Sequence, residues 1–200
     1  MGFSVNAISI FIAGEAARRV KLRDPGRVII FGGPGCFWKF QRLVTDLKSV
    51  DIFVVGEGEE ALLKIIRRLK EGMKIRMSPM VLTALPIKDL DSIPYPTFSG
   101  FDLAAYNPGS DYKPLPLLAS RGCINKCSYC IDIYYWPGYR FRTPAHVLGE
   151  IKYHMDKNGV SNFELNDLLC NGNLNNLSSF CDLIVDAGLK INWVSYAAIR

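Results

Sequence analysis

Three cysteines close together constrain this chain more than any other feature. Cys123, Cys127 and Cys130 have C-x-x-x-C-x-x-C spacing and follow Gly122 and a short apolar run at residues 116–119. Thiolates are soft ligands that favour iron-sulfur clusters, zinc or copper(I). A 4Fe-4S cluster has four irons, so three thiolates leave one iron without a nearby protein ligand. Such an open position binds a substrate or cosubstrate, and it indicates catalysis more than electron transport.

The same spacing, with Tyr129 just before the third cysteine, resembles the signature of the radical S-adenosylmethionine (radical SAM) enzymes. The resemblance implies that Cys123, Cys127 and Cys130 hold a 4Fe-4S cluster whose open iron chelates the amino and carboxylate groups of S-adenosylmethionine. It implies that one electron, from a donor such as flavodoxin or ferredoxin, cleaves the sulfonium to a 5'-deoxyadenosyl radical. It also implies that the backbone near Tyr129 contacts the adenine.

Three other interpretations of the cysteines are open. Their i, i+4, i+7 spacing also suits a buried apolar stripe on a helix, although Gly122, Asn125 and Ser128 are poor residues for a helix interior. A zinc site with a distant fourth ligand is the second, although structural zinc usually takes paired C-x-x-C knuckles. A disulfide framework is the third, and an apolar chain of this size has little need of one.

Length and composition indicate a globular protein. The chain has 200 residues, 49% of them hydrophobic, and a net charge of +5. This length allows one large or two small domains, and the mild charge does not favour nucleic acid as a partner. No signal peptide and no membrane-spanning run is expected, so a reducing cytoplasm is the predicted location.

The first third of the chain alternates strands and helices. Strands are predicted at residues 2–5, 28–31 and 51–55, and helices at 8–23, 38–48 and 59–70. This order predicts an α/β fold with a partial doubly wound parallel sheet at residues 1–72. A proline-rich linker is predicted at 73–114, and a second domain at 115–200.

The first domain resembles the cobalamin-binding domain that precedes the cysteine motif in one branch of radical SAM enzymes. Ser4 matches a serine of that domain, and Gly32 and Gly33 match its glycine pair near the nucleotide tail. The branch holds cobalt with an Asp-x-His-x-x-Gly segment, which neither His146 nor His154 fits. The sequence therefore leaves cobalamin binding open, and we expect the chain to be a fragment of a longer enzyme, truncated at both ends.

The second domain begins a barrel of βα units. Strands are predicted at 116–120, 162–166 and 191–199, and helices at 143–159 and 174–187. Because barrels place their chemistry at the carboxyl ends of strands, the cysteine loop and the polar pair Asn166 and Asp167 are expected at one edge. By resemblance, Asn166 and Asp167 contact the amino group of S-adenosylmethionine, although the family's usual Gly-Gly-Glu is not present.

The main hypothesis is a radical SAM enzyme that performs methyl transfer or another radical modification of a small molecule. One alternative is a methylthiotransferase acting on tRNA or a ribosomal protein, which would require more cysteines in the first domain. Another is a non-catalytic module that binds an iron-sulfur cluster or zinc.

Overall fold

A computed structural model describes residues 1–37, 44–72, 74, 79–106 and 113–199. The chain forms two compact units, Met1–Ile87 and Lys88–Arg200. No helix among the described residues combines the length and the apolar character needed to cross a membrane.

The first unit contains a four-stranded parallel sheet whose strand order follows the chain. It consists of β1 (Gly2–Ser4), β2 (Ile30–Gly32), β3 (Ile52–Val55) and β4 (Met80–Thr83). All four residues of β3 are buried, as expected for a central strand of a parallel sheet that is covered on both faces.

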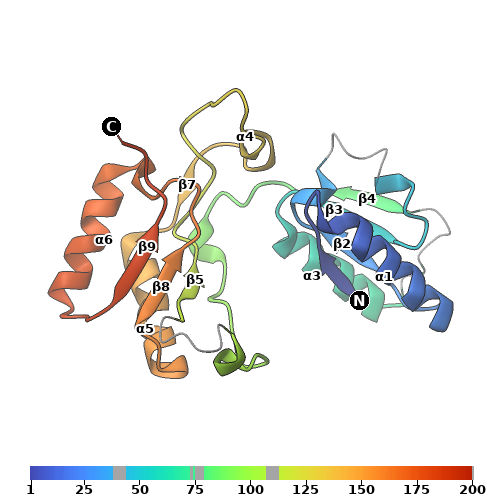
Figure 1. Cartoon of the computed structure of the whole chain (residues 1–200), viewed down its shortest axis with the longest axis horizontal. Coiled ribbons are helices and arrows are strands. Elements are labelled where there is room, and N and C mark those ends of the chain that lie inside the picture. The colour runs from blue at the N-terminus through green and yellow to red at the C-terminus, as the bar shows by residue number, and fades with distance from the viewer. Residues whose placement is uncertain (38–43, 73, 75–78, 107–112, 200) are drawn as a thin grey trace. The chain divides into compact units, whose positions relative to one another are not determined.

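Helices cover both faces of this sheet (Figure 1). Helix α1 (Ser9–Arg23) packs on the face that carries Phe31 and Phe53, whereas α3 (Gly58–Lys70) packs on the face that carries Ile52. The fold class predicted for this part is therefore confirmed. Most of the helix predicted at 38–48 lies outside the described residues.

Strand β4 lies within the residues for which a linker is predicted. It pairs in register with the whole of β3 and extends the sheet. The segment after it is held by Glu57, a buried carboxylate that accepts a hydrogen bond from the backbone of Ile87 at 3.1 Å. A four-residue strand between prolines has too little pattern for a prediction from sequence.

The second unit contains a three-stranded parallel sheet with helices on one face. Its strands β5 (Leu115–Leu117), β8 (Asn162–Leu165) and β9 (Asn192–Ser195) lie in that order. Helices α5 (Pro144–Asn158) and α6 (Leu174–Asp186) share one hydrophobic core with β5 and β8, centred on Ile151 and Phe163. These are the first βα units of the predicted barrel.

Helix α5 starts and ends as its sequence predicts. Thr143 is its N-cap and accepts a hydrogen bond from the backbone of His146, Pro144 is its first residue, and Gly159 ends it with a left-handed φ of 63°.

Candidate functional site

The cysteines lie on a loop that is closed by a short antiparallel ladder. Strand β6 (Ser120–Arg121) pairs with β7 (Arg140–Phe141), so the two ends of the segment 122–139 lie side by side. One further hydrogen bond, from the backbone N–H of Arg142 to the carbonyl of Ala119 at 2.8 Å, continues this closure. The loop also contains the short helix α4 (Asp132–Tyr135).

Gly122 sets the path of the chain into the loop. Its φ is +81°, and a Cβ atom there would lie 2.1 Å from the carbonyl oxygen of Gly138. The contact is with backbone, which cannot move aside as a flexible side chain can, so only glycine fits. Next to it in sequence, the guanidinium of Arg121 lies 5.2 Å from the ring centroid of Trp136, in cation–π geometry.

All three thiols of the motif line one pocket of about 250 Å³. Cys123, Cys127 and Cys130 are free and half-buried. The opposite wall is formed by residues that follow β8 and β9, and it consists of Leu168, Leu169, Tyr196, Ala197 and Ala198. The pocket therefore lies at the carboxyl edge of the parallel sheet, where barrels of this kind place their chemistry.

Hydrogen bonds tie the two segments of the opposite wall to each other. The Asn171 side chain donates to the carbonyl of Ala198 at 2.7 Å and accepts from the Ala198 N–H at 3.0 Å. The backbone N–H of Cys170 donates to the carbonyl of Tyr196 at 2.9 Å. The segments that follow β8 and β9 are thus joined to each other on this side of the pocket.

Two polar groups contact the thiols of the motif. The Asn125 N–H donates to the sulfur of Cys123 at 3.4 Å, and the sulfur of Cys130 lies 3.7 Å from a carboxylate oxygen of Asp132. The Tyr129 side chain is 89% exposed, and its contact with Cys127 raises the pKa of its hydroxyl. No group of three His, Cys, Asp or Glu side chains in the described residues converges as a single metal ion requires.

Asn166 and Asp167 follow β8, as predicted, but neither lines this pocket. The Asp167 side chain is buried, and its two oxygens accept hydrogen bonds from the Ala119 N–H at 2.8 Å and the Ser120 hydroxyl at 2.7 Å. Burial raises the pKa of this carboxyl. Asn166 is exposed, and its N–H donates to the Leu117 carbonyl.

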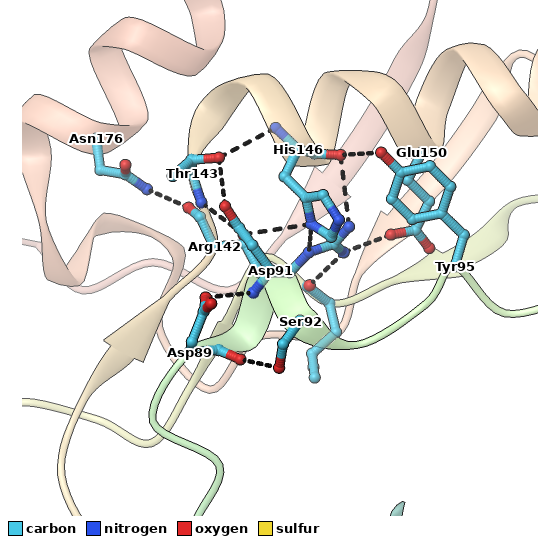
Figure 2. A network of polar contacts seen from close by, with 10 residues as sticks. Asp89, Asp91, Ser92, Tyr95, Arg142, Thr143, His146, Glu150 and Asn176 are labelled. Atoms are coloured by element: carbon cyan, nitrogen blue, oxygen red, sulfur yellow. Dashed lines mark hydrogen bonds and ion pairs between the residues drawn. The ribbon is translucent and has the colours of Figure 1, made fainter.

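A polar network centred on Arg142 joins the start of α5 to the residues around Asp91 and to the end of β5 (Figure 2). Its guanidinium donates to the carbonyl of Leu118 at 2.9 Å and to Nδ1 of His146 at 3.0 Å, and it forms an ion pair with the buried carboxylate of Glu150. Asp91 accepts hydrogen bonds from the N–H and the hydroxyl of Thr143. The network therefore fixes β5, α5 and the residues around Asp91 to one another.

The glycines and the serine of the first unit also come together at a carboxyl edge. Ser4 is paired in register with Gly32, and Gly33 has a φ of +93°. A Cβ atom on Gly33 would lie 2.9 Å from the Ser4 hydroxyl oxygen and 2.8 Å from the carbonyl oxygen of Val5. This edge is thus a place where backbone approaches backbone closely.

Several residues of the cysteine pocket were not predicted from the sequence. Asp132 lines it, as do residues 168–169 and 196–198. Residues 168–169 follow the predicted strand 162–166 closely, whereas residues 196–198 lie within the predicted strand 191–199, because the observed strand β9 ends earlier, at Ser195.

Comparisons with known proteins show which enzymes this chain resembles. No family model matches the chain. The chain is 28% identical over 202 residues to the anaerobic magnesium-protoporphyrin IX monomethyl ester cyclase of Cereibacter sphaeroides, and 28% identical over 180 residues to that of Synechocystis sp.. These matches cover 92% and 84% of the chain, but only 33% and 36% of the cyclases. The chain thus spans about a third of the length of these curated relatives.

Among solved structures, the chain resembles the radical S-adenosylmethionine methyltransferase TsrM from Kitasatospora setae, which was solved with cobalamin and a 4Fe-4S cluster bound. The TM-score is 0.63 at 17% sequence identity, over 93% of this chain and 41% of TsrM. At this identity the match concerns the fold. Together, the sequence relatives and the fold confirm the predicted resemblance of this chain to the cobalamin-binding branch of the radical SAM enzymes.

Proposed function

We propose that this chain is part of an enzyme that binds a 4Fe-4S cluster through Cys123, Cys127 and Cys130. The observation that carries the proposal is the pocket that these three free thiols share at the carboxyl edge of a parallel sheet. When bound and reduced, such a cluster supplies the one electron that splits S-adenosylmethionine into methionine and a 5'-deoxyadenosyl radical. The chain's own residues would hold the cluster, orient S-adenosylmethionine and limit the access of water.

The roles proposed for the other residues are those that the resemblance implies. Tyr129 is on the rim of the pocket, where its backbone would meet the adenine, and Asn166 and Asp167 remain proposed contacts for the amino group. The substrate is proposed to be a small molecule that undergoes methyl transfer or another radical modification. TsrM was solved with tryptophan as its substrate, which supports this class of substrate. Reduction by flavodoxin or ferredoxin and a cytoplasmic location complete the proposal.

Cobalamin is a further proposed ligand, at the edge formed by Ser4, Gly32 and Gly33. The support for this part is the resemblance of Ser4 and the glycine pair, together with their position side by side at the carboxyl edge of the sheet. Absorbance spectra of the purified protein mixed with hydroxocobalamin, followed by gel filtration, test this. Cobalamin that fails to co-elute with the protein would remove this part of the proposal.

The methylthiotransferase alternative is less well supported. It requires more cysteine ligands in the first unit, but Cys36 is fully buried, and burial raises the pKa of its thiol to about 12. A thiol in that environment is a packing residue and not a metal ligand.

Electron paramagnetic resonance of the protein, purified without oxygen and reconstituted with iron and sulfide, tests the main proposal. We expect a reduced-cluster signal that changes when S-adenosylmethionine is added. Cys127→Ala should abolish the signal, whereas Cys181→Ala, which removes a cysteine of α6 outside the loop, should leave it unchanged. A cluster that does not respond to S-adenosylmethionine would favour an electron-transfer module, and bound zinc without iron would exclude the radical mechanism.

A further inference from the structure

A buried carboxylate holds the chain where it enters the cysteine loop. The pairing of β5 with β8 continues past both strands, with a hydrogen bond from the Asn166 N–H to the Leu117 carbonyl at 2.8 Å. The side chain of Asp167 takes the next two donors, because it accepts the Ala119 N–H at 2.8 Å and the Ser120 hydroxyl at 2.7 Å. Ser120 and Asp167 are both only 2% exposed. The chain is thus fixed to the end of β8 three residues before the first cysteine of the motif.

The path from Ser120 to Cys123 has little room to move. Ser120 and Arg121 are paired with β7, at the exit of the loop. Gly122 packs so closely on that exit that a Cβ atom there would meet the carbonyl oxygen of Gly138. A displacement of Ser120 is therefore passed on to Cys123, because the two residues between them are themselves held.

The other end of the loop is held against the same segment of the chain. The Tyr139 ring lies so close to Gly172 that a Cβ atom on this glycine would be 2.5 Å from the Cζ atom of the ring. Burial raises the pKa of the Tyr139 hydroxyl, which contacts the Ser120 hydroxyl and the backbone of Asn173. Tyr139, Ser120 and Asp167 also line one small cavity of about 20 Å³. Both ends of the loop therefore meet the residues that follow β8.

The same segment forms part of the opposite wall of the cysteine pocket. Leu168 and Leu169, which line the pocket, come directly after Asp167. The contacts of Asp167 thus join this wall to the loop that carries the thiols, although Asp167 itself does not line the pocket. To contact the amino group of S-adenosylmethionine, its carboxylate would have to leave the donors at Ala119 and Ser120, so the two roles are alternatives.

We propose that Ser120 and Asp167 are positioning residues, whose buried hydrogen bond sets the cysteine loop at a fixed distance from the segment after β8. This inference rests on the proposed function, because it requires S-adenosylmethionine to bind in the cysteine pocket. A cosubstrate that is held between two walls loses affinity and orientation when one wall shifts by about 1 Å. The hydrogen bond therefore acts on the cosubstrate without touching it.

The test compares Ser120→Ala with the wild-type protein and with Ser195→Ala. The Ser195 hydroxyl donates to the carbonyl of Leu165 at 3.2 Å, so its variant also removes a serine hydrogen bond to β8, but one that does not involve the cysteine loop. Ser120 is buried and does not line the pocket, so its hydroxyl has no direct contact with a ligand there. Titration of the reduced-cluster signal with S-adenosylmethionine gives the dissociation constant for each protein, and the iron content shows whether the cluster assembles.

We expect Ser120→Ala to assemble the cluster but to raise the dissociation constant about tenfold, as when a residue that orients metal ligands is removed. The shape of its signal with S-adenosylmethionine bound should also change, whereas Ser195→Ala should match the wild type in both respects. The double variant Ser120→Ala/Asp167→Ala should bind no more weakly than Asp167→Ala, because the two side chains act as one unit.

Asp167→Asn separates positioning from a charged contact. The amide oxygen can still accept the Ala119 N–H, and the amide N–H can donate to the Ser120 hydroxyl oxygen, so both contacts are kept without the charge. The affinity of this variant should therefore stay near that of the wild type. A large loss of affinity in Asp167→Asn without a loss in Ser120→Ala would overturn the proposal and favour a direct contact with the amino group.

Failure of this inference is distinguishable from failure of the proposed function. If the wild-type protein forms no cluster, or a cluster that does not respond to S-adenosylmethionine, the proposed function fails and the inference fails with it. If the wild-type cluster responds and Ser120→Ala binds S-adenosylmethionine as tightly as Ser195→Ala does, only the positioning role is overturned. A lower free energy of unfolding in Ser120→Ala, with an unchanged dissociation constant and signal, would overturn it too, because the hydrogen bond would then serve stability alone.

Discussion

The two units present the same edge of a parallel sheet in different ways. At the carboxyl edge of the first sheet, Gly33 packs closely against Ser4 and the carbonyl of Val5. At the carboxyl edge of the second sheet, a long loop and two strand ends present cysteine, aspartate and tyrosine side chains around a pocket. The first edge is thus defined by contacts within the chain itself, whereas the second borders a pocket.

The comparison also extends to how each edge is supported. The first sheet is covered by helices on both faces and relies on apolar packing, whereas in the second unit the polar network around Arg142 joins the start of α5 to the end of β5. Substitutions should therefore harm the two units for different physical reasons.

Arg142→Leu should have the largest effect on stability. It leaves the Glu150 carboxylate buried without its main cation, which should lower the free energy of unfolding by about 4 kcal/mol. Arg18→Leu, which removes an exposed partner of Glu15 on α1, should cause no measurable change. Urea denaturation of both variants measures the two changes in the free energy of unfolding. Similar losses in the two variants would contradict the view that the network supports the second unit.

Gly122→Ala should have the second largest effect on stability. The new Cβ atom meets the carbonyl oxygen of Gly138 and the residue must keep a positive φ, so we expect a loss of about 3 kcal/mol together with the loss of the cluster signal. Gly138→Ala is the matched control, because Gly138 also has a positive φ but has open space around the Cβ position. It should cost only about 1 kcal/mol and keep the cluster. Equal iron contents in the two variants would contradict the role of the Gly122 contact.

Gly33→Ala tests the edge of the first unit. Its contacts with Val5 and Ser4 and its φ of +93° predict a loss of about 2 kcal/mol, with the cluster signal unchanged. Gly2→Ala, at a strand position with nothing within 4 Å, should change the stability by less than about 0.5 kcal/mol. A loss of the cluster signal in Gly33→Ala would show that the two edges are not independent.

The smallest effect concerns pH, and its sign should be opposite in the two units. The pKa of Glu15 is lowered to about 2 by its arginine partners, so its stabilising contribution is present above the unfolded pKa of 4.5 and is lost as the pH falls toward 2. The pKa of Asp167 is raised by burial above its ordinary value of 3.8, so its contribution is largest at low pH and declines as the pH rises past that value.

Unfolding of Glu15→Gln and Asp167→Asn across pH 2 to 7 measures both contributions. Relative to wild type, Glu15→Gln should lose less stability as the pH falls, although the effect is small because the pair is exposed. Asp167→Asn should be most destabilising at low pH and less so at neutral pH. The same pH trend in both variants would contradict these assignments.

Much of the fold follows from sequence patterns that have one physical solution. The continuous apolar runs around Phe31 and Phe53 suit only strands covered on both faces, and Thr143, Pro144 and Gly159 mark the ends of α5. Strand β4 lacks such a pattern, because its pairing depends on β3 and not on its own residues.

The candidate site was predictable to a different degree. The spacing of the cysteines is enough to predict a metal-binding loop, because the three thiols are close together in the chain itself. By contrast, the inward turn of Asp167 depends on donors at Ala119 and Ser120, which are almost fifty residues away in sequence. The contribution of Asp132 to the pocket depends on how the loop folds back over the strand ends, which no local pattern specifies.

The hydrogen bonds from Asn171 to Ala198 and from Cys170 to Tyr196 have a consequence for the rate of ligand exchange. Because they join the segments after β8 and β9, that wall cannot open in small steps; at least three hydrogen bonds must break together. We expect opening on the cysteine-loop side, where Tyr129 is 89% exposed, to require fewer broken contacts. The residence time of a ligand in the pocket would then be governed by the motion of the loop that also carries the proposed cluster ligands, so binding and release would depend on the state of that proposed site.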